Sequence, residues 1–189
     1  MKYNRNQDSS FWKLARSFLH EYMPIVRNLS DKTVESYKIS IKLYLTFIND
    51  EKNITNDKIT FDIFTRANMK DYIVWLKNKN ASAKTINLRM TALKSFLKYC
   101  SEEDFELRVF YNNACTIKGQ KIIKKPIEYL KPEATKAILS AFVGDTVKHR
   151  RNRMILILMY DSGCRVQEIA DLKVSSLHLD VRNPYMTVI

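Results

Sequence analysis

Apolar side chains recur every three or four residues along much of this chain, and this spacing restricts its fold more than any other feature. Such spacing places the apolar residues on one face of an α-helix. Glycine and proline, which interrupt helices, occur only three and four times in 189 residues. The chain therefore predicts a mainly α fold. The clearest stripe follows Ser30 and consists of Val34, Tyr37, Ile41, Tyr44, Leu45 and Ile48.

Several helices are predicted in the first half of the chain, with a loop over the Asn-rich segment 49–57. We expect Pro24 to end or kink the first helix, and Ser30 or Asp31 to cap the second. In the last of these helices, a stripe of lysine, asparagine and threonine lies opposite the apolar stripe. The predicted helices cover residues 11–26, 31 to about 48, 65–77 and 82–100.

We expect two units joined by a basic linker: a helical domain over residues 1–112, the linker over 113–125 and a second unit over 126–189. The linker region contains Gly119 and several lysines without sustained periodicity. It either follows a phosphate backbone or forms a solvated tether. The second unit is predicted to contain a helix beginning at Pro132, an apolar helix ending near Ser162, a helix over 166–173 and a strand over 185–189.

The charge of the chain indicates a polyanionic partner. Lysine and arginine outnumber aspartate and glutamate by 32 to 20, which gives a formal net charge of +12. Nucleic acid is the first candidate and an anionic membrane surface the second, while a basic protein without such a partner is the plain alternative. The longest apolar run, Met154 to Tyr160, is too short to span a bilayer, so we expect no membrane.

Cysteine and histidine spacing gives no indication of a metal site or a disulfide framework. The three cysteines form no CxxC pair, and the three histidines lie at no metal-ligand spacing from them. The N-terminus lacks a signal-peptide core. We therefore expect a reducing, cytoplasmic setting and no metal or cofactor.

The stretch from Arg151 to Lys173 carries the most suggestive chemistry. It predicts an apolar helix, a break at Gly163 and a second helix that begins near Arg165. An arginine side chain binds two phosphate oxygens at once and stabilises the charge that develops in phosphoryl transfer. Glu168 lies three residues on, where a helix would bring it to the same face. The ordinary interpretation is a C-capping glycine followed by a surface Arg–Glu pair.

Several stretches resemble the tyrosine recombinase (phage integrase) family. Y-D-S-G-C-R-V-Q-E-I-A-D-L-K is similar to the family's "TGLRxsEllxLk" box, and Y-L-K-P-E-A-T-K-A-I-L resembles the opening of its catalytic domain. L-S-D-K-T-V-E-S-Y-K-I-S-I-K-L-Y-L-T-F-I and S-A-K-T-I-N-L-R-M-T-A-L-K-S-F-L-K-Y resemble its core-binding domain. The resemblance implies a four-to-five-helix SAM-like core-binding domain. The helical start of an integrase catalytic domain, with a short terminal β-strand, would follow.

The resemblance also implies roles for two residues. Arg165 corresponds to the first catalytic arginine, which contacts the scissile phosphate, and Glu168 corresponds to the acidic residue that supports the active site. The chain departs from the box at Ser162, Cys164 and Gln167. The family's catalytic lysine, second arginine and nucleophilic tyrosine have no counterpart here, so the resemblance implies an incomplete catalytic domain.

The implied reaction of the full-length enzyme cuts and rejoins double-stranded DNA through a 3′-phosphotyrosyl intermediate, without a cofactor and as a tetramer on paired DNA sites. Whether this chain is itself an enzyme stays open, and we expect it to bind DNA as a monomer without cleaving it. Tyr160 and Tyr185 lie in apparent core patterns and are not assigned as nucleophiles. Two alternatives remain: a non-enzymatic DNA-binding or regulatory protein derived from such a recombinase, and a basic helical interaction protein.

DNA contacts are inferred from the resemblance, which places the second and fourth helices in the major groove. Phosphate contacts would dominate affinity, and asparagine and lysine can read base edges. A solvated face is the alternative at each position. The candidates are Lys32, Ser36, Ser40, Lys84, Asn87, Arg89, Thr91, Lys94 and Lys98.

Overall fold

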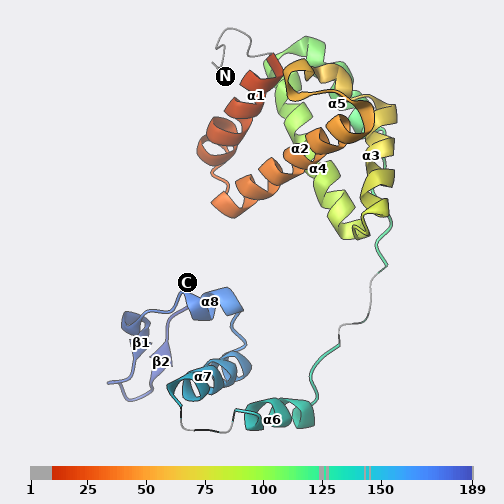
Figure 1. The fold of residues 1–189 in the computed structure, drawn as a ribbon. Helices are drawn as coiled ribbons and strands as arrows, with labels where there is room; N and C mark the ends of the chain where they lie inside the picture. Colours follow the sequence, from red (N-terminus) through yellow and green to blue (C-terminus); the bar gives the residue numbers. More distant parts are fainter. Residues whose placement is uncertain (1–9, 124–125, 127, 143, 145, 189) are drawn as a thin grey trace. The chain divides into compact units, whose positions relative to one another are not determined.

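The computed structural model describes residues 10–123, 126, 128–142, 144 and 146–188. The chain divides into two compact units, Met1–Lys124 and Lys125–Ile189. Helices dominate both units, and a short antiparallel strand pair lies in the second (Figure 1). The prediction of a mainly α fold is confirmed.

The first unit is a helical bundle in which the two longest helices cross (Figure 1). Hydroxyl groups cap two of its helices: Ser82 Oγ accepts the amide N–H of Thr85 and Thr65 Oγ accepts that of Asn68, each at 3.1 Å. The helices are α1 (Ser10–Ser17), which continues as a π-helix (Phe18–Val26), α2 (Asp31–Lys52), α3 (Arg66–Asn78), α4 (Ala83–Glu103) and α5 (Arg108–Cys115). Short 3-10 turns lie at Asn56–Lys58, Phe61–Ile63 and Phe105–Leu107.

Aromatic side chains form the core of this unit. Phe96 of α4 is fully buried, and its ring centroid lies 5.7 Å from that of Phe11 and 5.4 Å from that of Phe18. Tyr44 is also fully buried, and its hydroxyl donates a hydrogen bond to the carbonyl of Ile63 at 2.7 Å. Each ring buried in this way stabilises the fold by roughly 1.5–3 kcal/mol. The apolar residues at helical spacing therefore form one core that joins α1, α2, α3 and α4.

Several details of the first unit differ from the sequence prediction. The loop expected over 49–57 begins later, because α2 continues to Lys52. Of the two outcomes expected at Pro24, an end or a kink, the end is wrong. The helix continues through Pro24 to Val26 with π-type hydrogen bonding, as in the bond from the Arg27 N–H to the Tyr22 carbonyl at 2.9 Å. The linker expected from residue 113 begins later, because α5 continues to Cys115 and packs through the buried Ala114.

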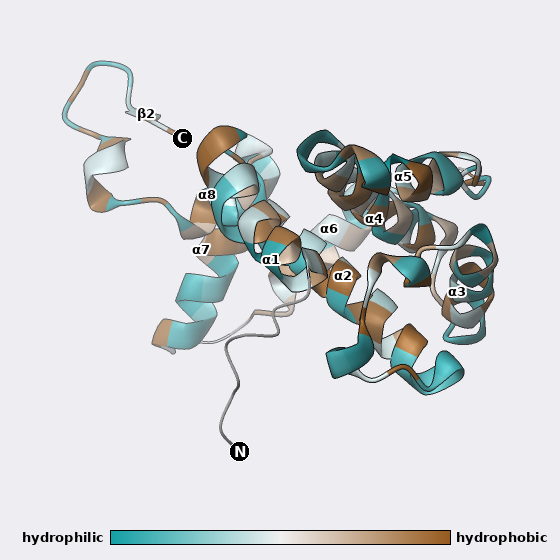
Figure 2. Cartoon of the chain, turned by 90° about the horizontal axis from the view of Figure 1, so that it is seen from above, coloured by the Kyte–Doolittle hydropathy of each residue, from teal (hydrophilic) through white to brown (hydrophobic). Residues whose placement is uncertain are grey.

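The second unit consists of α6 (Pro132–Ser140), α7 (Val147–Ser162), α8 (Val166–Ala170) and the paired strands β1 (Leu177–His178) and β2 (Tyr185–Met186). Strand β1 was not predicted, and α8 is shorter than expected. Helix α7 changes from hydrophilic to hydrophobic along its length (Figure 2). Among the residues described in this unit, no apolar side chain is buried, and Met154 is 64% exposed.

Candidate phosphate-binding turn and DNA-binding face

The turn between α7 and α8 presents Arg165. Helix α7 ends at Gly163, which has a φ of 65° and donates its N–H to the Met159 carbonyl at 3.1 Å. Glycine adopts this left-handed conformation without strain. A Cβ at this position would meet no heavy atom within 4 Å, so the backbone conformation is the reason for glycine here. Arg165 follows in extended conformation and begins α8.

Glu168 holds both the backbone and the side chain of Arg165. Its Oε2 accepts the Arg165 backbone N–H at 2.7 Å, and its Oε1 accepts Nη1 of the guanidinium at 2.6 Å. These two bonds, the backbone bond first, lower the pKa of Glu168. The carboxylate is therefore ionised at neutral pH and restricts the orientation of the arginine.

The guanidinium remains accessible although it is braced. The side chain of Arg165 is 85% exposed, whereas that of Glu168 is 24% exposed. One guanidinium N–H faces the carboxylate, and an arginine carries five such donors. The turn therefore has both features of the ordinary interpretation, a C-capping glycine and a surface Arg–Glu pair. It also leaves the Arg165 guanidinium accessible to a phosphate.

A hollow of about 360 Å³ lies beside Glu168, between α8 and the strand pair. Lys173, Ser175, Ser176 and His178 contribute polar groups to it, together with Thr187, whose hydroxyl lies 3.3 Å from His178 Nε2. Within the ranges that the structure describes, no cluster of side chains could hold a metal ion.

The tyrosines of this unit differ from expectation. Tyr160 is 62% exposed and Tyr185 is 57% exposed, so the core positions predicted for them are wrong. They are exposed because the described part of this unit encloses no apolar core. Tyr185 stacks on His178 with ring centroids 4.3 Å apart.

In the first unit, Arg89 and Ser40 connect α4 to α2. Arg89 Nη1 donates to Ser40 Oγ at 2.9 Å and to the Ser36 carbonyl at 3.3 Å, and Ser40 Oγ donates to the same carbonyl at 2.7 Å. Ser40 is fully buried, so its hydroxyl is not on the surface expected to meet DNA. It is the partner that orients Arg89, because the two helices pack at this point.

Asn87 and Lys94 also have partners within the unit. Asn87 Nδ2 donates to the Gln120 carbonyl at 2.9 Å, and its Oδ1 accepts the Gln120 N–H at 2.7 Å. Lys94 Nζ donates to the carbonyl of the buried Ile117 at 2.7 Å. A Cβ at Gly119 would lie 3.3 Å from Asn87 Oδ1, so the segment lies close against the helix. Residues 117–120, which we call the strap, are therefore held on the polar face of α4.

Helical periodicity did not reveal the strap. It places Asn87 and Lys94 on one face of α4 but gives no information about a segment that follows in the chain and packs there. Gly119 was the one sequence signal for the strap. The chain has only three glycines, and the lack of a side chain at Gly119 allows the backbone to lie close to Asn87.

The other candidate residues of this unit lie at or near the surface. Lys32, Lys84 and Thr91 are exposed and Ser36 is half-buried. The first turns of α2 and α4 lie at the lower edge of this unit in Figure 1. Lys98, at the other end of the polar stripe, forms an ion pair with Glu102 at 3.7 Å. Lys32 and Lys84 thus place exposed cationic side chains at the first turns of α2 and α4.

Comparison with known proteins identifies the class of this helical unit. Residues 17–104 match the family model for the phage integrase N-terminal SAM-like domain. The chain is 30% identical over 163 residues to tyrosine recombinase XerD of Oceanobacillus iheyensis, a match that covers 86% of this chain and 52% of that protein.

A second curated relative agrees. Tyrosine recombinase XerC of Chlamydia muridarum is 26% identical over 170 residues, covering 83% of this chain and 53% of that protein. The chain thus spans about half the length of the curated relatives it matches. It belongs to the tyrosine recombinase (phage integrase) family.

No described helix is both long and apolar enough to cross a membrane.

Proposed function

We propose that this chain is the DNA-binding part of a site-specific tyrosine recombinase, which cuts and rejoins double-stranded DNA through a 3′-phosphotyrosyl intermediate. The observation that carries the proposal is the Arg165–Glu168 turn in a chain of this family. A cation that is braced on one side and exposed on the other suits a phosphate ligand. We place it in a reducing compartment such as the cytoplasm, because its three cysteines form no CxxC pair and suggest no disulfide framework.

Arg165 binds the non-bridging oxygens of the scissile phosphate. Negative charge accumulates on these oxygens as the attacking and leaving oxygens exchange, and a preorganised guanidinium stabilises it. Glu168 supplies the preorganisation through its bonds to the Arg165 backbone and side chain. Glu168 is therefore a positioning residue.

The DNA-binding face consists of Lys32, Ser36, Lys84 and Thr91, with Arg89 between α2 and α4. Contacts from these residues to phosphates would set the position of the unit on DNA. Ser40 orients Arg89, and Asn87 and Lys94 hold the strap, so these three act on DNA binding through their neighbours.

The test of this function is Arg165→Ala in a recombinase that contains this chain and the nucleophilic tyrosine. We expect cleavage of a nicked substrate to fall by about 10³-fold or more, because the transition-state charge loses its ligand. DNA affinity should change by less than about threefold, because one of several phosphate contacts is removed. Arg165→Lys is the matched control that keeps the charge but loses the bidentate geometry. Equal loss of cleavage and binding would contradict the role.

A further inference from the structure

A groove runs along the first unit between α1, with its π-helix, and α2. Its volume is about 610 Å³, within the range of sites that bind small molecules. Ala15 and Leu19 lie on one wall, and Ile41 and Leu45 lie on the other. Each pair is four residues apart, so each helix turns one apolar face toward the groove. These four side chains carry no hydrogen-bonding group, and they form the floor of what we call the α1–α2 groove.

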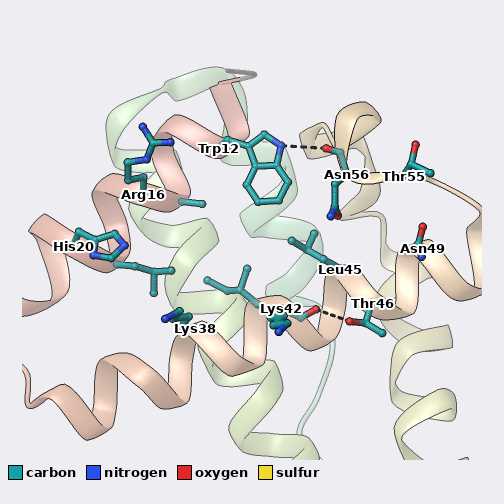
Figure 3. Close-up of a pocket in the computed structure, with 13 residues that line it drawn as sticks. Trp12, Arg16, His20, Lys38, Lys42, Leu45, Thr46, Asn49, Thr55 and Asn56 are labelled. Carbon is teal, nitrogen blue, oxygen red and sulfur yellow. Dashed lines mark hydrogen bonds between the residues drawn. The ribbon is translucent and has the colours of Figure 1, made fainter. Parts of the chain in front are cut away.

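The floor and one end of the groove are fixed by the fold. Ile41 and Leu45 are buried and belong to the core. Trp12 closes one end, where its indole N–H donates to the Asn56 carbonyl at 3.2 Å (Figure 3). Its ring packs edge-on against that of the buried Phe11, with centroids 5.1 Å apart. The groove is therefore preformed, and a ligand binds without the entropic cost of ordering the walls.

The wall that carries Leu19 and His20 has an uncommon backbone conformation. The α-helix passes at Phe18 into a π-helix that continues to Val26. Hydrogen bonding of the π type is rare, and it is frequent at functional sites where it interrupts α-helices. This feature is independent of the side chains in the groove, and it favours a functional role for this wall.

Basic side chains form the rim of the groove. Arg16 and His20 extend from one wall, and Lys38 and Lys42 extend from the other (Figure 3). Lys38 also pairs with Glu35 of its own helix at 3.5 Å, a surface pair of small energetic weight. None of the described residues that line the groove is acidic. The rim therefore suits an anionic group, whereas the floor suits an aliphatic one.

The shape of the groove indicates an elongated occupant. His20 and Lys38 lie toward one end, and Trp12 and Asn56 lie at the other (Figure 3). An occupant that matches both chemistries carries its charge near His20 and Lys38 and extends its apolar body along the floor toward Trp12. A compact polyanion such as inorganic phosphate would leave the aliphatic floor uncovered, so it matches only the rim.

We propose that the α1–α2 groove binds a free medium-chain carboxylate, that is, an unbranched aliphatic acid in its ionised form. The carboxylate accepts hydrogen bonds from the basic rim. The chain covers the floor, where its methylene groups are removed from water. The site shares no residue with the Arg165 turn or with the DNA-binding face, so the inference goes beyond the proposed function and does not depend on it.

Fluorescence quenching by a brominated dodecanoate tests the site in the whole chain, because bromine quenches an indole ring only at short range. The two tryptophans are Trp12, in the groove, and Trp75, on α3 outside it. In Trp75→Phe, where Trp12 is the only reporter, quenching should saturate with a dissociation constant on the order of 10–100 µM. In Trp12→Phe, the emission of Trp75 should stay unchanged.

A series of ligands tests the floor and the rim without any change to the protein. Octanoate, decanoate and dodecanoate should displace the brominated probe with increasing affinity, by up to about fourfold for each added methylene that is buried. Dodecyltrimethylammonium has the same chain and the opposite charge. It should bind at least about tenfold more weakly than dodecanoate, because the rim repels it.

Charge reversal tests the rim in the protein. Lys42→Glu should weaken dodecanoate binding by about tenfold or more, because it replaces an attractive charge with a repulsive one. Lys70→Glu, at an exposed position of α3 outside the groove, is the matched control and should bind dodecanoate within about twofold of the unmodified chain. Circular dichroism checks that both variants remain folded.

Four results would overturn the proposal: no saturable quenching of Trp12 up to about 1 mM ligand, equal quenching of Trp75, equal affinity for the carboxylate and the ammonium compound, or an equal effect of the two lysine variants. Binding to phosphatidylglycerol vesicles but not to dissolved dodecanoate would also overturn it, because the ligand would then be a membrane surface. DNA binding is measured separately, so its failure would be distinguished from failure of this site.

Discussion

Both units contain apolar residues at helical spacing, but these residues are buried in the first unit and remain partly exposed in the second. In the first unit, apolar residues at helical spacing meet residues of other helices, and side chains such as Phe96 and Tyr44 are fully buried. In the described residues of the second unit, the apolar half of α7 stays partly exposed. Periodicity therefore specifies a helix with an apolar face, whereas a core requires other elements to cover that face.

The largest difference expected from this comparison is in stability. Phe96→Ala should lower the free energy of unfolding by about 3–5 kcal/mol, because it leaves a cavity among buried rings. Leu158→Ala in α7 should cost less than about 1.5 kcal/mol, because that side chain is only half-buried. Urea titration followed by circular dichroism measures both. Fluorescence adds a report on the first unit alone, since both tryptophans, Trp12 and Trp75, lie there. Similar costs would show that the second unit has a core of its own.

A smaller effect is expected at the strap. Asn87→Ala removes both hydrogen bonds to the Gln120 backbone, a loss of about 1–3 kcal/mol for partly buried groups. Hydrogen exchange of the Gln120 amide should become faster by about tenfold or more, while amides in the middle of α4 stay protected. Thr91→Ala, at an exposed position of the same helix, is the matched control. Unchanged exchange at Gln120 would show that Asn87 does not hold the strap.

The smallest effect concerns the pH dependence of the Arg165 turn. The hydrogen bonds from Arg165 lower the pKa of Glu168. Their contribution to the stability of the folded state is therefore complete above the ordinary pKa of glutamate. It is lost as the pH falls through the lowered value of the folded state. Carbon-13 NMR titration of the Glu168 carboxyl should show this. In Arg165→Ala the pKa should rise only in part, because the backbone N–H remains. A titration at the ordinary value in the unmodified chain would rule out the pairing.

The sequence was sufficient for the helices that carry their own periodicity. The stripes beginning at Val34 and Ile86 correctly predicted α2 and α4, and Ser30 and Ser82 correctly marked where they begin. Helix α5 was not delimited because its eight residues are too few for a clear period. The sequence also could not show that Ser40 is buried while Ser36 is only half-buried, because the burial of Ser40 depends on where α4 crosses α2.

The candidate site was predicted unevenly for a related reason. Arg165, Gly163 and Glu168 lie within six residues, so local geometry alone brings them together. Asn87 and Lys94 depend on residues 117–120, and no local pattern shows that this segment returns to α4. Contacts close in the chain were therefore accessible from sequence, whereas contacts made across the bundle were not.

The central claim, that the cations at the first turns of α2 and α4 bind DNA, is tested most directly by fluorescence anisotropy with a labelled duplex over a range of salt concentrations. Three cationic contacts, from Lys32, Lys84 and Arg89, would reduce affinity by roughly 40-fold between 50 and 200 mM salt. Lys84→Ala should lower the slope of log affinity against log salt by about one contact, whereas Lys42→Ala, at an exposed position of α2 outside the proposed face, should leave it unchanged. The account predicts this steep dependence and this difference between the two lysines. An affinity that does not fall as salt rises would contradict it.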